Sequence, residues 1–500
     1  MLRSCLAVKF CRRLLTFLLS ICVPVGLLSA PPAAAQDAAK PNIVFILLDD
    51  LEVSPVGYMN WTKTLVRNQG TEFQKAYLSV PLCGPSRAGI VSGKYPQNSS
   101  VYGNSGHTSF RTAVQDVSTM ATWLHDAGYR TSMVGKYMNN YPKPEVTTYI
   151  PPGWDDWHVR YAGDPYDGQY KYKLNENGVL KSYGSKSTDY STDLYRARAV
   201  TFVRDSIARQ TPFFLYFAPH APHSPFVPAP RDAELFPKLK ALRSPSFNEA
   251  DVSDKPAYVA NRPLLTGSQV TTVDTAYRNR VRMVQAVDKA VKAIIDALVA
   301  GGQFENTYII FASDNGWIAG PHRFTGTKGA PYEEVTRMVF FLRGPGVPAG
   351  LKLQHLAANI DIAPTIAELA GVEVPADVDG RSLAPLLRAD RPEPSAWRQS
   401  FLMQFELSSG APSIPSWIGL RTPTLSYVSY PATSETELYD HVTDPYELAN
   451  GAATADPRLL AWLAAQTAAL SLCSGAGCRA LEDTPIPTFE EPPPTDPTPP

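Results

Sequence analysis

The chain has 500 residues, of which 44% are hydrophobic and 10% aromatic, so it is long enough to bury one large core and a smaller appended one. Its 46 basic and 47 acidic residues leave a formal net charge of −1. Because no strong overall field results, the composition argues against nucleic acid or an anionic membrane surface as a partner. Any anion must be recognised by a local group of residues.

The first 35 residues have the form of a secretory signal peptide. Basic residues between positions 3 and 13 precede an apolar stretch over residues 14–28, and the small-residue run Ala33–Ala35 follows. We predict cleavage after Ala35, with an uncleaved anchor helix as the alternative. No later segment is long and apolar enough to span a bilayer, so no stable membrane insertion is expected. The predicted location is secreted or periplasmic.

Residues 36–385 are predicted to form an α/β domain. Short apolar strand-like runs alternate there with helix-like stretches, a pattern typical of a large, mostly parallel sheet flanked by helices. Helices are expected at Val117–Ala127 and at Arg278–Ala300, the second because its apolar residues recur three and four positions apart.

Four of the apolar runs end in polar side chains. The runs and the residues after them are Asn42–Leu48 with Asp49 and Asp50, Tyr129–Val134 with Lys136, Phe213–Ala218 with His220 and His223, and Tyr308–Ala312 with Asp314 and Asn315. In open α/β sheets, ligands bind beyond the carboxyl ends of the strands. We therefore expect these side chains to converge on one edge of the sheet, although polar loop residues also follow buried strands for no functional reason.

Residues 386–480 are predicted to form a smaller α+β subdomain. Strands are expected at Phe401–Phe405 and Leu425–Val428, and a closing helix at Leu459–Leu472. Residues 481–500 are rich in proline and acidic side chains and are predicted to be a disordered tail.

After signal removal three cysteines remain. Cys473 and Cys478 flank a short glycine-containing loop and are expected to form a disulfide in an oxidising compartment, with two free thiols as the alternative. Cys83 is then left without a partner, and the ordinary explanation is a buried inert thiol. However, Cys83 opens the run Cys83-Gly84-Pro85-Ser86-Arg87, and Pro85 suits the first turn of a helix that Gly93 would end. The free N–H groups and the macrodipole at such a helix N-terminus favour an anion beside the Cys83 side chain.

This run resembles the hallmark Cys-x-Pro-Ser-Arg of the sulfatase family, whose cysteine is oxidised to formylglycine by a separate maturation enzyme. Further matching pieces follow in order: Asp49-Asp50, Gly135-Lys136-Tyr137, Pro222-His223-Ser224-Pro225, Ser313-Asp314-Asn315-Gly316, Thr327-Lys328-Gly329, Glu437-Leu438-Tyr439-Asp440 and Asp444-Pro445. The resemblance runs from about residue 41 to about residue 450. It implies an alkaline phosphatase-like catalytic domain and an antiparallel sheet in the C-terminal subdomain.

The resemblance also implies a mechanism. A hydrated formylglycine at Cys83 has two hydroxyls, so one attacks the sulfur of a sulfate ester and the other later expels sulfate by restoring the aldehyde. The oxygens of Asp49, Asp50, Asp314 and Asn315, with residue 83 itself, suit a hard divalent cation. We expect Ca²⁺, as in similar sulfatases, while oxygen ligands also accept Mg²⁺.

Cationic groups are needed near so many negative charges. By resemblance, Arg87 steadies the formylglycine hydrate, Lys136 and Lys328 contact sulfate oxygens, and His223 donates a proton to the departing alcohol. His220 is the competing candidate for that acid. Many sulfatases carry Gly-Lys-Trp-His where this chain has Met138 in place of the histidine, which leaves the base that regenerates the aldehyde unassigned.

The sequence is most similar to the glucosamine-6-sulfatase subgroup, through Pro152-Gly153-Trp154, Asn248-Glu249-Ala250-Asp251-Val252 and Ala286-Val287-Asp288. This predicts an exported sulfuric ester hydrolase acting on sulfated sugars and aryl sulfates. The alternatives are a phosphonate or phosphate ester hydrolase of the same superfamily and a catalytically silent protein that binds sulfated glycans. His322 and Arg323 either contact substrate or support their loop.

Overall fold

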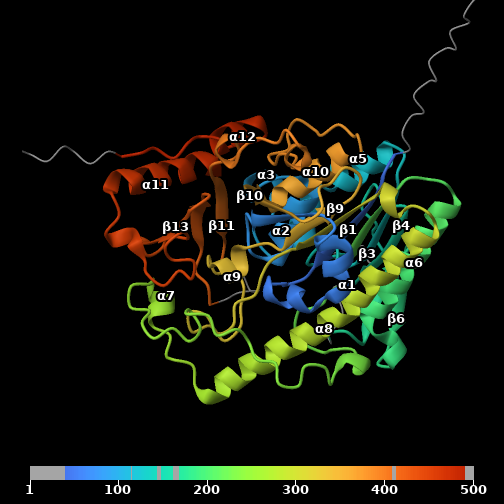
Figure 1. Cartoon of the computed structure of the whole chain (residues 1–500), viewed down its shortest axis with the longest axis horizontal. Helices are drawn as coiled ribbons and strands as arrows, with labels where there is room; N and C mark the ends of the chain where they lie inside the picture. Colours follow the sequence, from blue (N-terminus) through green and yellow to red (C-terminus); the bar gives the residue numbers. More distant parts are fainter. Residues whose placement is uncertain (1–39, 114, 143–147, 162–167, 408–412, 490–500) are drawn as a thin grey trace, which may run out of the picture. The chain divides into compact units, whose positions relative to one another are not determined.

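The computed structural model in Figure 1 describes residues 40–113, 115–142, 148–161, 168–407 and 413–489. The predicted signal peptide and residues 490–500 of the predicted tail lie outside these ranges. Within them, no helix combines the length and the apolar character that a membrane crossing requires.

The centre of the fold is a ten-stranded mixed sheet. Its five parallel neighbours β8, β1, β7, β3 and β4 are flanked by antiparallel pairings of β9, β5 and β6. This confirms the predicted large, mostly parallel sheet. In spatial order the strands are β10 (Leu351–Ala358), β2 (Thr71–Tyr77), β9 (Phe340–Arg343), β8 (Thr307–Ser313), β1 (Asn42–Leu48), β7 (Phe213–Ala218), β3 (Arg130–Gly135), β4 (Asp156–Arg160), β5 (Tyr172–Glu176) and β6 (Val179–Tyr183).

Helices cover both faces of this sheet. Alternate residues of β1 point to opposite faces, so Phe45 packs in one apolar cluster and Ile46 in the other. The first cluster includes residues of α2 (Cys83–Ser92), α5 (Met120–Asp126) and α10 (Ile362–Leu369), and the second includes residues of α6 (Ser191–Ala208) and α8 (Gly267–Ala300). Burial on both faces explains why the strand runs are continuously apolar.

The two helices predicted from spacing are present. α5 lies inside the predicted range, whereas α8 begins at Gly267 rather than at Arg278. Its first turns carry mostly polar residues, so the apolar pattern is absent there, and the Thr266 hydroxyl caps the helix by accepting from the Gln269 amide. The remaining short helices are α1 (Asn60–Thr62), α3 (Pro96–Ser99), α4 (Gly106–Thr112), α7 (Ala257–Ala260) and α9 (Glu333–Thr336).

A second sheet of four antiparallel strands follows, in the order β11 (Phe401–Phe405), β12 (Trp417–Arg421), β13 (Leu425–Tyr430) and β14 (Glu435–Asp440). It packs with α11 (Pro457–Ser471), and Figure 1 shows both in the orange to red part of the chain. The predicted smaller sheet is thus confirmed, while β12 and β14 were missed. The predicted disulfide Cys473–Cys478 is present.

The last helix, α12 (Ala476–Glu482), ends inside the segment predicted as a tail. The Glu482 carboxylate is buried and accepts from Arg398 Nε at 2.8 Å and from Arg381 at 3.1 Å. The expected start of the tail at residue 481 is therefore too early, because a buried ion pair holds Glu482 in the folded part.

Candidate active site

Four neighbouring parallel strands bring the predicted polar residues to one edge of the sheet. β8, β1, β7 and β3 lie side by side and end immediately before Asp314, Asp49, the His220–His223 turn and Lys136 respectively. Asp50 adopts a left-handed backbone conformation (φ 59°), and its amide donates to Asp314 Oδ1 at 3.0 Å. The convergence expected from the strand ends is therefore observed.

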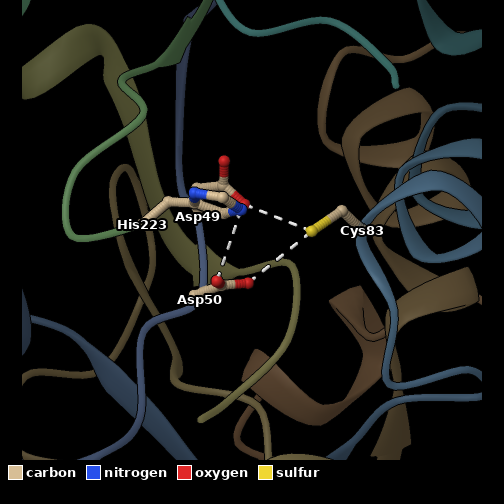
Figure 2. Close-up of side chains that lie close together, drawn as sticks. All are labelled: Asp49, Asp50, Cys83 and His223. Atoms are coloured by element: carbon tan, nitrogen blue, oxygen red, sulfur yellow. Dashed lines mark hydrogen bonds and ion pairs between the residues drawn. The ribbon is translucent and has the colours of Figure 1, made fainter. Parts of the chain in front are cut away.

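Cys83 is the first residue of α2 and faces these carboxylates. Its Sγ lies 3.4 Å from Asp49 Oδ1 and 3.6 Å from Asp50 Oδ1, as Figure 2 shows. α2 ends at Ser92, and Gly93 follows in a left-handed conformation (φ 70°), as predicted. Burial raises the pKa of the Cys83 thiol well above its ordinary value despite the nearby Lys136 and Lys328. An unmodified thiol at this position is therefore protonated and a poor nucleophile.

Each of the three aspartates forms its shortest ion pair with a different cationic side chain. Lys136 Nζ lies 2.7 Å from Asp49 Oδ2, Lys328 Nζ lies 2.7 Å from Asp50 Oδ1, and Arg87 Nε lies 2.7 Å from Asp314 Oδ2. All six side chains are buried or nearly so. The three carboxylates and the three cationic side chains thus cancel in charge, which offsets the cost of burying them together.

The pKa values follow from these pairings. Burial alone would raise the pKa of Asp49, but Lys136 and the neighbouring cationic groups hold it well below its ordinary value. Lys328 and His223 likewise lower the pKa of Asp50 against the effect of burial. Burial and the nearby Asp49 raise the pKa of Asp314 to about 6. Two of the three carboxylates are therefore strongly held in the charged form.

Two buried oxygens at the centre of the cluster accept no hydrogen bond from the described residues. They are Asn315 Oδ1 and Asp50 Oδ2. The Asn315 amide nitrogen is already used, because it donates to Asp50 Oδ1 at 2.6 Å and to the Gly316 carbonyl at 2.9 Å. Buried polar atoms normally take part in a hydrogen bond. Carboxylate and amide oxygens that accept none are suitable ligands for a hard cation. The residues present therefore fit a Ca²⁺ or Mg²⁺ ion.

The two histidines after β7 have different surroundings. His223 Nε2 lies 3.6 Å from Asp50 Oδ2, and His223 Nδ1 lies 2.6 Å from the Ser224 carbonyl oxygen. Because a carbonyl only accepts, Nδ1 carries the proton of that bond and Nε2 is the nitrogen that faces the cluster. His220 is buried, with its ring 6.4 Å from that of Tyr195. The structure thus directs His223 towards the carboxylates.

Backbone geometry fixes Lys136 and Lys328. Gly135 has φ 116°, and a Cβ there would lie 2.0 Å from the Ala218 carbonyl oxygen. Only glycine therefore allows the end of β3 to lie this close to β7, which fixes the position of the next residue, Lys136. Lys328 precedes Gly329, whose carbonyl oxygen accepts from Trp417 Nε1 at 2.7 Å. The C-terminal sheet therefore positions a residue of the cluster.

Two supporting groups had no motif in the sequence. Asn104 Oδ1 accepts from the Gly84 amide at 3.0 Å and so fixes the first turn of α2, and Trp417 holds Gly329. His322, which we expected either to contact substrate or to support its loop, is fully buried, and its Nδ1 lies 2.6 Å from Glu249 Oε2. Arg323 donates to three backbone carbonyls, so both residues support the loop.

The fold and this cluster define a class of α/β proteins in which a site for a hard cation and a candidate nucleophile lie together at one edge of a mostly parallel sheet. The sulfatase family model matches residues 41–372, and the model described as N-sulphoglucosamine sulphohydrolase, C-terminal, matches residues 320–462. Because the first match covers more than half of the chain, this protein belongs to the sulfatase family.

Two relatives illustrate the range of the similarity. The human N-acetylglucosamine-6-sulfatase is 30% identical over 485 residues, which are 89% of this chain and 87% of that protein. The extracellular sulfatase SULF-1 homolog of Drosophila melanogaster is 33% identical over 373 residues, which are 73% of this chain but 33% of that protein. This chain therefore matches about a third of the length of the second relative.

Solved structures share the fold. One described as a complex with its substrate D-glucosamine-2-N,6-O-disulfate has a TM-score of 0.74 at 24% identity, covering 86% of this chain and 97% of that one. A phosphonate monoester hydrolase from Silicibacter pomeroyi has a TM-score of 0.65 at 22% identity, covering 86% of this chain and 94% of that one. At these identities the comparison supports the architecture alone.

Proposed function

We propose that this protein is an exported sulfatase that hydrolyses sulfate esters with a formylglycine made from Cys83 and a bound Ca²⁺. The observation that supports this most directly is the position of the Cys83 side chain. It lies within hydrogen-bonding range of Asp49, Asp50 and Lys328. A formylglycine at this position would therefore be next to two proposed ligands of the metal ion and one positively charged side chain.

Asp49, Asp50, Asp314 and Asn315 would hold the cation, and the Asp50 and Asn315 oxygens that accept no hydrogen bond support this assignment. A bound Ca²⁺ supplies Lewis acidity towards the sulfate oxygens. The three carboxylate–cation pairs cancel, so a divalent ion would leave the site positive and attractive to a sulfate monoanion. The larger and more flexible oxygen sites of proteins favour Ca²⁺ over Mg²⁺.

A hydrated formylglycine supplies two hydroxyls, one to attack sulfur and one to restore the aldehyde as sulfate leaves. Around it, Lys136 and Lys328 would bind sulfate oxygens after exchanging their contacts with Asp49 and Asp50. Arg87 would keep its place, because its Nη1 donates to the Lys136 carbonyl at 2.6 Å and its Nε to Asp314 at 2.7 Å. Arg87 therefore orients both the cation site and the segment that carries Lys136.

His223 would protonate the departing alcohol. Its Nδ1–H is committed to the Ser224 carbonyl, so the acid would be the doubly protonated imidazolium, whose Nε2–H lies on the side of the cluster. Burial lowers the pKa of His223, whereas the Asp50 and Asp49 carboxylates oppose that shift and favour the charged form. A good phenol leaving group departs as the anion and needs this proton little, whereas a sugar hydroxyl needs it strongly.

Sulfated sugars of the glucosamine-6-sulfate kind are the substrates we infer, with aryl sulfates as surrogates. The similarity to N-acetylglucosamine-6-sulfatases over most of the chain supports this class. Export is supported by the signal-like first 35 residues and by the disulfide Cys473–Cys478, a bond that persists in oxidising compartments. A formylglycine-generating enzyme of the host would be the partner that matures Cys83.

Turnover of matched aryl esters tests this function. Protein made in a host that matures Cys83 should hydrolyse 4-nitrophenyl sulfate faster than the corresponding phenyl phosphonate ester, and Cys83→Ala should abolish turnover while retaining the fold. A preference for the phosphonate would point to the phosphonate hydrolase alternative. Binding of sulfated glycans without turnover by matured protein would point to the silent binding protein.

A further inference from the structure

A cavity of about 330 Å³ lies between the C-terminal sheet and the loop that follows α3. Its lining includes Tyr102 on one side and Gln404, Phe405, Glu406 and Trp417 on the other. The first residue comes from the catalytic part of the chain and the other four from β11, β12 and their connection, so the cavity joins two elements about 300 positions apart in sequence.

Both walls of this cavity touch the immediate neighbours of candidate catalytic residues. On one side, the Tyr102 loop continues through Gly103 and Asn104, and Asn104 Oδ1 accepts from the amide of Gly84, the residue after Cys83. A Cβ on Gly84 would lie 2.7 Å from the Gly103 carbonyl oxygen, so the loop and the start of α2 are in close contact.

On the other side, Trp417 Nε1 donates to the carbonyl oxygen of Gly329, the residue after Lys328, at 2.7 Å. A Cβ on Gly329 would lie 2.5 Å from the Phe405 ring. The cavity therefore lies beside the segments that support both residue 83 and Lys328.

The lining has the chemistry of a sugar-binding site. Tyr102 is 40% exposed, which leaves an aromatic face for the apolar face of a sugar ring. Among the described residues that line the cavity, Glu406 is the one with a charged side chain, and it is exposed. Tyr102 and Glu406 line the same cavity, and burial together with the Glu406 carboxylate raises the pKa of Tyr102.

We propose that this cavity binds the sugar ring that carries the sulfate ester, and that Glu406 selects rings with a free, positively charged amine over rings with a second anionic group. The inference rests on the proposed sulfatase function and names its substrate class. A carboxylate accepts from hydroxyls and attracts an ammonium group, whereas it repels an N-sulfate at the same position.

The test measures kcat/KM for three glucosamine 6-sulfates that differ only at nitrogen: the free amine, the N-acetyl and the N-sulfo compound. Wild-type protein should prefer the free amine over the N-sulfo compound. Glu406→Lys should shift the ratio of these two kcat/KM values by about tenfold or more towards the N-sulfo compound, since one exposed ion pair is lost and a new one forms. Glu406→Gln should give an intermediate ratio. Glu373→Lys, the same charge reversal at an exposed position after α10, should leave the ratio unchanged.

Tyr102→Ala provides a second variant that does not depend on charge. It should raise KM for all three sugars by about three- to tenfold, while Tyr102→Phe stays close to wild type, because the ring face rather than the hydroxyl is used. An unchanged amine-to-N-sulfo ratio in Glu406→Lys, with wild-type protein active on 4-nitrophenyl sulfate, would overturn the cavity assignment alone. Matured wild-type protein inactive on every sulfate ester would overturn the proposed function and this inference together.

Discussion

The side-chain ammonium of Lys328 lies 2.7 Å from Cys83 Sγ. The same ammonium lies 2.7 Å from Asp50 Oδ1, so the Lys328 side chain contacts both residue 83 and a proposed ligand of the Ca²⁺ ion. Burial lowers and the Asp50 carboxylate raises the pKa of Lys328, and the net effect is a pKa well above its ordinary value. Lys328 is therefore charged throughout the working range and placed to stabilise negative charge on whatever residue 83 carries.

Lys328→Met should lower kcat/KM for 4-nitrophenyl sulfate by about 10²- to 10³-fold, because it removes a preorganised positive group at the point where charge develops. Steady-state kinetics of folded, matured protein measures this. Lys292→Met is the matched control, since it breaks a solvent-exposed Lys–Asp pair of 2.5 Å with Asp296, and it should retain wild-type kcat/KM. A loss of only a few-fold in Lys328→Met would contradict the assigned role.

His223→Gln should harm substrates with poor leaving groups more than those with good ones. The rate constant kcat/KM for a series of aryl and alkyl sulfates, plotted against the pKa of the leaving alcohol, should acquire a steeper slope. His220→Gln is the comparison variant, and it should leave that slope at the wild-type value because His220 is buried beside Tyr195. Equal losses for all leaving groups in His223→Gln would argue against an acid role, and a steeper slope only in His220→Gln would transfer that role to His220.

Removal of the cation should abolish activity without unfolding the protein. Lys136, Lys328 and Arg87 pair with Asp49, Asp50 and Asp314, so these three buried carboxylates keep a cationic partner when the bound ion is removed. After treatment with a chelator, circular dichroism should stay native while turnover is lost. Added Ca²⁺ should restore turnover and raise Tm, and do so better than Mg²⁺ at equal concentration. Unfolding on chelation would show that these ion pairs do not suffice.

Arg398→Met should destabilise the whole C-terminal part. Arg398 is fully buried and pairs with Asp361 at 2.5 Å and with Glu482 of α12 at 2.8 Å. Its loss leaves the buried Asp361 without its cationic partner and leaves Glu482 with Arg381 alone. We expect a reduction of about 3–5 kcal/mol in the free energy of unfolding, measured by denaturant titration. Arg388→Met breaks a pair with Glu368 in which the arginine side chain is 62% exposed, and it should cost about 1 kcal/mol or less. Equal effects of the two variants would contradict the buried-pair account.

The sequence predicted the site better than it predicted the outer parts of the fold. β1 and β7 were located to the residue because they are apolar on both faces and end at charged side chains. The helix at Cys83 followed from Pro85 and Gly93, whose backbone preferences leave few alternatives. These signals are local, and they also lie at the edge where ligands bind.

Other features depend on partners far away in the chain. β12 has no apolar alternation that distinguishes it from a loop, and it becomes a strand only between β11 and β13. The one-to-one pairing of Lys136 with Asp49 joins positions 87 residues apart, and no spacing rule indicates it. The same holds for Tyr102 and Glu406, whose shared cavity exists only after the C-terminal sheet has packed.

Mass spectrometry of the peptide that contains Cys83, with turnover measured on the same sample, tests whether formylglycine at position 83 carries the reaction. Preparations matured to different extents should show 4-nitrophenyl sulfate turnover in proportion to the fraction of that peptide with the mass of formylglycine. Full turnover from a sample in which Cys83 is entirely unmodified, or none from a fully converted sample supplied with Ca²⁺, would rule out formylglycine at position 83 as the nucleophile of this reaction.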